Sequence, residues 1–195
     1  MKNFFLKFLL ASLLGIFSLQ CYANDRIRFA SPSLKISFPK PNSIIQFFAT
    51  TPPDESSYSG IAVHIQVPDK GNKYYDVFAG VIGAEEVPYP RPYLEIVSVF
   101  LENVDETSEK ALFIIGATQI LHRGNNTEGY KYSIYIFKHP GDKRFISGLP
   151  RLTEIEKQIG DGFGGIMEGE LITAPYKNAA DVRNILKRLG YLKGE

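Results

Sequence analysis

Residues 111–138 read ALFIIGATQILHRGNNTEGYKYSIYIFK, and this stretch contains the clearest structural pattern in the chain. Its two arms, 112–121 and 130–137, are rich in β-branched and aromatic residues, which favour strands. The linking sequence RGNNTEG contains glycine and asparagine, which tolerate the positive φ that a chain reversal needs. The pattern predicts a β-hairpin in which Arg123 lies opposite Tyr130.

Alternation of apolar and polar residues predicts further strands on both sides of this hairpin. The segment 94–101 is apolar on both faces, so we expect it to lie at the centre of a sheet. The other candidate strands are 34–38, 44–50, 61–67, 74–82 and 166–172.

Helix signals are concentrated near the C-terminus. Asn178 can cap a helix in which Val182, Ile185, Leu186 and Leu189 share one face, and Gly190 can end it in the left-handed conformation. A shorter helix is predicted over 153–159. The expected fold class is α+β: mainly antiparallel β-sheet, or a partly closed barrel, with the C-terminal helix packed on it.

The first 23 residues have the three parts of an export signal. Two lysines precede an apolar run of 12 residues, Phe8–Leu19, and small residues stand at Cys21 and Ala23 before the expected cut. This run is shorter than the roughly 20 residues that cross a bilayer as a helix. We therefore expect a signal peptide over 1–23, a single domain over 24–195, a periplasmic or secreted location, and no membrane span.

The alternative processing route would attach a lipid to Cys21 and anchor the protein to a membrane. Lipoprotein signals have small residues directly before the cysteine, whereas Leu19 and Gln20 stand there. The sequence therefore favours the cleavable signal.

Removal of Lys2 and Lys7 with the signal leaves 20 of the 22 basic residues against 21 acidic ones, a net charge of about −1. A near-neutral chain lacks the basic surface that nucleic acids require, so we expect no nucleic-acid partner. Cys21, the only cysteine, leaves with the signal, and we expect no disulfide and no thiolate metal site.

Two sets of residues could in principle bind a cofactor or a metal ion: a glycine-rich sequence and the histidines. Gly160, Gly162 and Gly165 satisfy G-x-G-x-x-G, but a predicted helix precedes them and a predicted strand follows, the reverse of a dinucleotide site. A turn that leads into a strand is the simpler interpretation. His122 and His139 fall at opposite ends of the predicted hairpin and cannot share a metal ion, so neither a cofactor nor a metal is expected.

Glu168 and Glu170 are two residues apart on the predicted strand 166–172 and would therefore project from one face. Paired carboxylates can hydrolyse glycosidic bonds, although an acidic solvent-facing sheet gives the same pattern.

Two segments have the composition of a protein-binding surface. Residues 88–93, PYPRPY, form a stiff extended segment that presents Tyr89, Arg91 and Tyr93. The second segment is the hairpin tip, with the candidate residues Arg123, Asn125, Asn126 and Tyr130.

Without a catalytic set, the sequence favours an exported, non-enzymatic binding protein with a protein partner in the cell envelope, such as an inhibitor or immunity protein. The alternatives are an envelope glycan hydrolase that uses Glu168 and Glu170, and a carrier of a small apolar ligand in a barrel. Homo-oligomerisation stays open.

Overall fold

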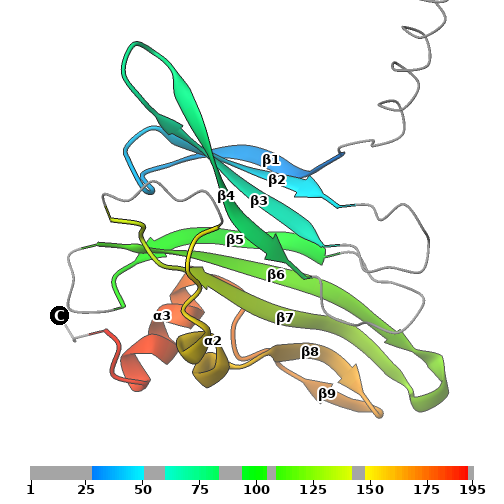
Figure 1. Ribbon diagram of the computed structural model, residues 1–195. Coiled ribbons are helices and arrows are strands. Elements are labelled where there is room, and N and C mark those ends of the chain that lie inside the picture. Colours follow the sequence, from blue (N-terminus) through cyan, green and yellow to red (C-terminus); the bar gives the residue numbers. More distant parts are fainter. Residues whose placement is uncertain (1–27, 51–59, 84–93, 105–108, 142–147, 193–195) are drawn as a thin grey trace, which may run out of the picture.

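The computed structural model describes residues 28–50, 60–83, 94–104, 109–141 and 148–192, which form two antiparallel sheets and two helices (Figure 1). The predicted signal peptide 1–23 with Cys21, and the segment 88–93 with Tyr89, Arg91 and Tyr93, lie outside the described residues. Those predictions stay predictions.

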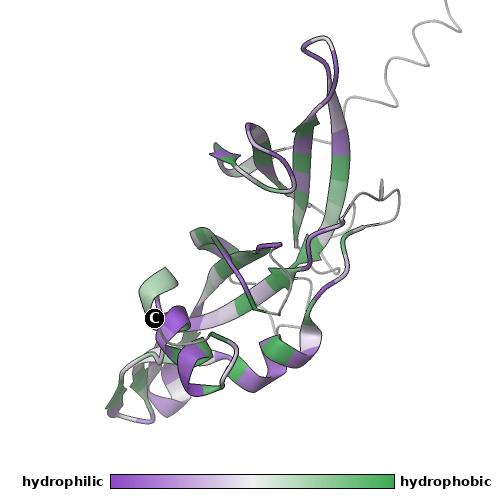
Figure 2. Ribbon diagram, turned by 90° about the vertical axis from the view of Figure 1, so that its left-hand side faces the viewer, coloured by the Kyte–Doolittle hydropathy of each residue, from purple (hydrophilic) through white to green (hydrophobic). Residues whose placement is uncertain are grey.

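The first sheet, sheet A, contains four strands that pair in the order of the chain. It consists of β1 (Arg28–Ile36), β2 (Ser43–Ala49), β3 (Ile61–Pro68) and β4 (Tyr74–Ile82). Alternate residues of β2 and β3 are buried, as the sequence alternation predicts. Bands of hydrophobic and hydrophilic residues along these strands are visible in Figure 2.

The second sheet, sheet B, contains five strands, also in the order of the chain. They are β5 (Leu94–Glu102), β6 (Ala111–His122), β7 (Thr127–Phe137), β8 (Gly162–Met167) and β9 (Glu170–Ile172). A 3₁₀ turn, η1 (Arg123–Asn125), links β6 to β7. The predicted hairpin is therefore confirmed and forms the middle of this sheet.

Two helices, α2 (Thr153–Ile159) and α3 (Ala179–Arg188), cover the face of sheet B that points away from sheet A (Figure 1). Both were predicted. The Asn178 side chain accepts hydrogen bonds from the backbone N–H groups of Ala180 and Asp181, at 2.9 and 3.1 Å, and Gly190 has φ 81°. The expected cap and the expected terminator of α3 are confirmed.

The molecule thus has three layers and two hydrophobic cores. The first core lies between the sheets, where Phe47 and Val63 of sheet A meet Leu112 and Phe137 of sheet B. The second core lies between sheet B and the helices. Its principal side chains are Phe113, Ile115, Ile134, Ile136, Tyr176, Val182 and Leu186.

This layering corrects two expectations. Within the described residues each sheet is open, so the mainly antiparallel sheet with a C-terminal helix is confirmed, and the partly closed barrel is wrong. The strand with the long buried run is β6, an interior strand whose residues 111–117 are all buried, whereas β5 lies at the edge of sheet B. Apolar residues on both faces of a strand indicate that other layers pack above and below it. They do not indicate whether another strand pairs with each of its edges.

Candidate functional site

The distal part of sheet B extends beyond the two cores. We call this part the extension; it consists of residues 118–131 of the β6–β7 hairpin together with β8 and β9 (Figure 1). The burial of β6 changes abruptly at its entrance, because residues 111–117 are buried and residues 118–122 are half-buried or exposed. Four paired strands therefore project from the body of the protein.

The hairpin turn is tighter than the sequence predicted. Asn126 takes the left-handed conformation with φ 50°, and β7 begins directly after it at Thr127. Tyr130 consequently lies opposite Gln119, four residues from the expected partner Arg123. The predicted register is therefore wrong by four residues. Because successive side chains point to opposite faces of a strand, a shift by an even number leaves each side chain on its predicted face.

A second turn lies beside the first and is bonded to it. Glu168 and Gly169, with φ 54° and 88°, form the two-residue turn between β8 and β9. The Gly169 N–H donates to the carbonyl oxygen of Asn126 at 3.3 Å, and the Glu168 N–H donates to the buried hydroxyl of Thr127 at 3.3 Å. We call the residues 123–126 and 168–169 the paired tips, because these bonds hold the two turns together.

Glycines allow the strands of the extension to approach closely. A Cβ at Gly165 would stand 2.3 Å from the carbonyl oxygen of Glu128, and a Cβ at Gly129 would stand 2.4 Å from that of Gly164. Gly162 leaves room for Pro175 in the same way. The G-x-G-x-x-G sequence therefore begins at the end of α2 and continues within β8, where its glycines serve packing.

The extension is rich in exposed apolar side chains. Six of the twelve exposed large hydrophobic residues in the described part of the chain belong to it: Leu121, Tyr130, Ile166, Met167, Leu171 and Ile172. The most exposed of all is Leu171, with 83% of its surface accessible. A solvated sheet normally presents polar residues at such positions, so this surface has the composition of a contact region.

The strand register places four of these residues on one face. Leu121 pairs with Glu128, Glu128 with Ile166, and Ile166 with Leu171, which makes one row across all four strands. Tyr130 lies two residues from Glu128 and shares its face, the one that α2 and α3 cover further along the sheet. We call Leu121, Tyr130, Ile166 and Leu171 the apolar face of the extension.

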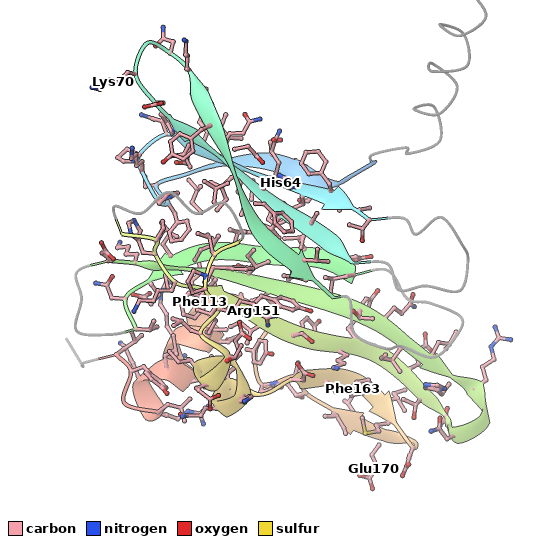
Figure 3. All side chains as sticks on the ribbon, in the orientation of Figure 1. His64, Lys70, Phe113, Arg151, Phe163 and Glu170 are labelled. Atoms are coloured by element: carbon pink, nitrogen blue, oxygen red, sulfur yellow. The ribbon has the colours of Figure 1, made fainter. Side chains whose placement is uncertain are left out.

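Carboxylates lie within and beside this apolar surface: Glu128 stands in the row itself, and Glu168 and Glu170 stand at its border. Glu128, Glu168 and Glu170 are exposed, and the ion pairs formed among the described residues involve none of them. Figure 3 shows the Glu170 side chain at the free rim of the extension, directed away from the body of the protein. Asp161 in this region is bonded instead to Lys131, at 2.8 Å.

The predicted strand with paired carboxylates is wrong. Glu168 lies in the turn and Glu170 begins β9, so the two residues do not share a strand, and both are exposed. The hydrolase interpretation depended on two carboxylates projecting together from one strand, and that arrangement is not present.

The predicted hairpin-tip residues lie together in the extension. Arg123, Asn125 and Asn126 form the first of the paired tips, and Tyr130 belongs to the apolar face. The sequence reasoning missed Leu121, Ile166 and Leu171. For Ile166 and Leu171 a signal was present in the sequence GIMEGELI, residues 165–172, where large apolar residues stand beside glycines and acids.

The three histidines lie apart and differ in surroundings. The Nδ1–H of His64 donates to Asp76 at 2.8 Å, and its ring contacts Phe48 and Phe78 with both ring centroids 5.3 Å away (Figure 3). His64 is therefore held among aromatic rings on the outer face of sheet A. His122 is exposed at the tip end of β6.

His139 joins two loops. Its Nδ1 accepts from the Gly141 N–H at 3.0 Å, so the proton is on Nε2, which donates to the carbonyl oxygen of Pro39 at 2.9 Å. The Glu109 carboxylate is more distant, at 3.4 Å from Nδ1. Both ring nitrogens are satisfied by backbone groups, which indicates a structural role.

Tyr176 fixes the base of the extension to the helical layer. Its side chain is fully buried, and its hydroxyl lies 2.8 Å from the carbonyl oxygen of Gly160 and 3.1 Å from that of Tyr132. Burial, and to a lesser extent the Asp161 carboxylate, raises the pKa of this phenol far above the ordinary tyrosine value. The neutral hydroxyl is the form that can donate to these carbonyls.

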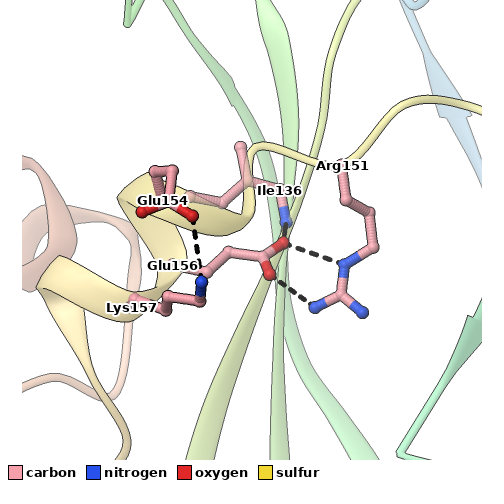
Figure 4. Close-up of polar contacts among 5 residues, drawn as sticks. All are labelled: Ile136, Arg151, Glu154, Glu156 and Lys157. Carbon is pink, nitrogen blue, oxygen red and sulfur yellow. Dashed lines mark hydrogen bonds and ion pairs between the residues drawn. The ribbon is translucent and has the colours of Figure 1, made fainter.

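A carboxylate completes the edge of β7 where β8 no longer pairs with it. Glu156 of α2 accepts the Ile136 N–H at 2.6 Å and binds Arg151 through both of its oxygens, at 3.0 and 2.5 Å (Figure 4). The Glu156 side chain is only 9% exposed. This pair fixes α2 to sheet B just beyond the extension.

No three of the described His, Cys, Asp and Glu residues stand close enough to bind a metal ion together. None of the described helices combines the length and the apolar character required to traverse a membrane.

Comparison of the chain with protein-family models, with curated proteins and with solved structures finds no match in any of the three. Function is therefore inferred from the geometry of the extension.

Proposed function

We propose that this chain is an exported, non-enzymatic binding protein that docks a protein partner in the cell envelope through the extension. Inhibitors and immunity proteins act in this way, by placing a projecting element against the surface or into the cleft of an enzyme. The N-terminal sequence supports export, since residues 1–23 have the pattern of a cleavable signal.

One observation carries the proposal: half of the exposed large hydrophobic residues that the structure describes gather on a projecting sheet. Each of them loses water contact when a partner covers it, at a gain of about 25 cal/mol for every Å² of apolar surface buried. The hydrogen bonds between the paired tips keep the backbone ordered before binding, which reduces the entropy lost on association. Tyr130 and Arg123 belong to the residue types that most often anchor interfaces.

The test compares two variants of the mature protein with serine in place of exposed apolar residues. Leu121→Ser/Ile166→Ser removes two members of the apolar face, whereas Tyr74→Ser removes a residue that is 50% exposed on β4 of sheet A. Each tagged protein is incubated with envelope extract, and the amount of retained protein is quantified against the amount of bait.

We expect the unaltered protein and Tyr74→Ser to retain one species in near-stoichiometric amount, and Leu121→Ser/Ile166→Ser to retain at least about tenfold less. Circular dichroism first establishes that both variants are folded. Equal retention by the two variants would show that docking does not use the extension, and no stoichiometric species with any bait would contradict the proposed function.

A further inference from the structure

The outer edge of β9 is open. β9 is the last strand in the order of sheet B, so within the described residues no strand pairs with its outer side. The turn at Glu168–Gly169 has two residues, and the residues that flank such a turn, Met167 and Glu170, form a hydrogen-bonded pair. Pairs alternate along the strands, which leaves the N–H and C=O of Leu171 directed to the open edge.

The side chain of Leu171 is exposed to solvent, and so are the backbone groups that this residue directs to the outer edge of the strand. It is 83% exposed at one end of the row that begins at Leu121, and its neighbour Ile172 is 36% exposed on the opposite face. A strand placed beside β9 would therefore find unpaired backbone groups at its edge and apolar side chains on both faces. An extended chain satisfies all of these groups together, whereas a helix cannot bond to the strand edge.

We propose that β9 binds an extended segment of the protein partner as a sixth strand of sheet B, and that this segment carries basic residues around an apolar centre. This inference rests on the proposed function and specifies how the extension recognises its partner. Backbone bonds at Leu171 set the register of the added strand, and the exposed carboxylates select its charge.

The negative charge beside the outer edge of β9 indicates which kind of segment would bind there. Glu168, in the turn before β9, and Glu170, at the start of β9, are exposed beside the open edge without an ion-pair partner among the described residues, whereas Glu128 lies two strands away on β7. A segment with lysine or arginine beside its apolar centre would pair with Glu168 and Glu170, whereas an acidic segment would be repelled.

A second copy of this chain fits poorly. If two β9 strands paired antiparallel about Leu171, the two Glu170 carboxylates would lie on one face in diagonal cross-strand positions, where like charges repel. Exposed acids on a short edge strand are a common protection against self-association of sheets. The same acids leave the edge accessible to a basic segment.

The probes are synthetic heptapeptides with blocked ends. The basic peptide is Lys-Val-Lys-Val-Lys-Val-Lys; the acidic control has glutamate in place of each lysine, and the third peptide has proline in place of the central valine. Binding to the full mature protein is followed by amide chemical shifts and by titration at low and at high salt.

Two variants separate the backbone edge from the side chain. Leu171→Pro removes the outward N–H and keeps the bonds between β8 and β9, because the other residues of β9 make those bonds. Leu171→Ala removes the side chain and keeps the N–H. Thermal unfolding of both variants is measured first, to establish that the extension stays folded.

We expect the basic peptide to bind at least about tenfold more tightly than the acidic one, to shift the amides of residues 170–172, and to weaken with salt. We expect Leu171→Pro and the proline peptide to abolish these shifts, and Leu171→Ala to weaken binding only in part. Equal binding of all three peptides, shifts confined to another surface, or a dimer in sedimentation that Leu171→Pro dissociates would each overturn the inference.

The two proposals fail in different ways. If Leu121→Ser/Ile166→Ser loses the envelope partner while Leu171→Pro keeps it, the extension docks by its face and the strand-addition inference alone is wrong. If neither variant affects partner retention, the proposed function is wrong as well.

Discussion

A single buried hydroxyl ties the base of the extension to the helical layer. Tyr176 donates toward the carbonyl oxygens of Gly160 and Tyr132, which belong to the end of α2 and to β7. Loss of this hydroxyl leaves one or both carbonyls without a partner in a region that water does not reach freely. The residue therefore links the position of β8 to the packing of the core.

Tyr176→Phe tests this link. We expect the variant to lower the free energy of unfolding by about 1 kcal/mol at pH 7, the usual contribution of one such hydrogen bond. Urea unfolding of both proteins followed by circular dichroism measures the difference. Tyr74→Phe removes a hydroxyl from a half-exposed side chain and is the matched control, expected to be near neutral.

The same variant has a distinct pH dependence. The pKa of Tyr176 is raised in the folded protein, so its contribution to stability is complete below the unfolded value of about 10 and declines as the pH rises above it. The stability lost between neutral pH and pH 11 should therefore be smaller in Tyr176→Phe than in the unaltered protein. Parallel pH profiles of the unfolding temperature would contradict a raised pKa.

Gly165 is the second residue on which the extension depends. Its φ of 149° lies in a region that side chains rarely adopt, and an added Cβ would collide with the Glu128 carbonyl 2.3 Å away. No flexible side chain is present to move aside, because the colliding atoms belong to the backbone of β7.

We expect Gly165→Ala to destabilise the protein by about 2 kcal/mol, within the usual range for overpacking, and to separate β8 from β7. Hydrogen exchange of the β7 and β8 amides measures this local loss. Gly124→Ala, at a position where an added Cβ meets nothing within 4 Å, is the control and should leave exchange unchanged.

Among the elements, α2 is short and depends on tertiary bonds. Its seven residues are too few for a stable isolated helix, and its first residues have no side-chain cap. Glu156 compensates by bonding to Arg151 and to the free N–H of Ile136 on β7. One carboxylate thus orders the helix and completes the edge of the sheet.

Replacement of Glu156 by alanine should cost about 2 kcal/mol, because it leaves the N–H of the buried residue Ile136 unpaired. Glu154→Ala, on the same helix, removes an ion pair with Lys157 in which both side chains are more than 70% exposed, and should change stability by less than about 0.5 kcal/mol. Denaturant unfolding of the two variants gives the comparison. Similar losses in both would show that the bond to β7 contributes little.

At the scale of the whole molecule, sheet B belongs to both cores. Leu112 and Phe137 face sheet A, while Phe113 and Ile136, one residue away on the same strands, face the helices. Neither outer layer can lose its packing without exposing one side of these strands. The three layers should therefore unfold together.

Phe47→Ala in the first core and Leu186→Ala in the second test this cooperation. Both side chains are fully buried, and each truncation should cost about 3 kcal/mol. Far-ultraviolet and near-ultraviolet circular dichroism should nevertheless give coincident unfolding curves in each variant. Two separated transitions would show that one layer unfolds independently.

The sequence by itself determined the elements that depend on neighbouring residues. Alternation located β2, β3 and β4, and it located only the last part of β1, which was predicted over 34–38 and spans Arg28–Ile36. Glycine and asparagine located the reversal between β6 and β7, and Asn178 and Gly190 marked the ends of α3. These signals are local because φ preferences, capping bonds and the alternation of side chains operate over a few residues. For the same reason, the local sequence was enough to recognise a turn with the residues Arg123, Asn125 and Asn126, and a strand residue, Tyr130, beside it.

Tertiary structure alone decided the arrangement that forms the candidate site. The edge position of β5, the turn at Glu168 and the meeting of the paired tips all depend on contacts between residues far apart in the chain, such as Gly129 with Gly165. Exposure of Leu121 and Leu171 follows from the same contacts, since the layers that bury other apolar residues end before they reach the extension. An apolar residue has the same sequence signal in a core as on a binding surface, and only packing distinguishes the two.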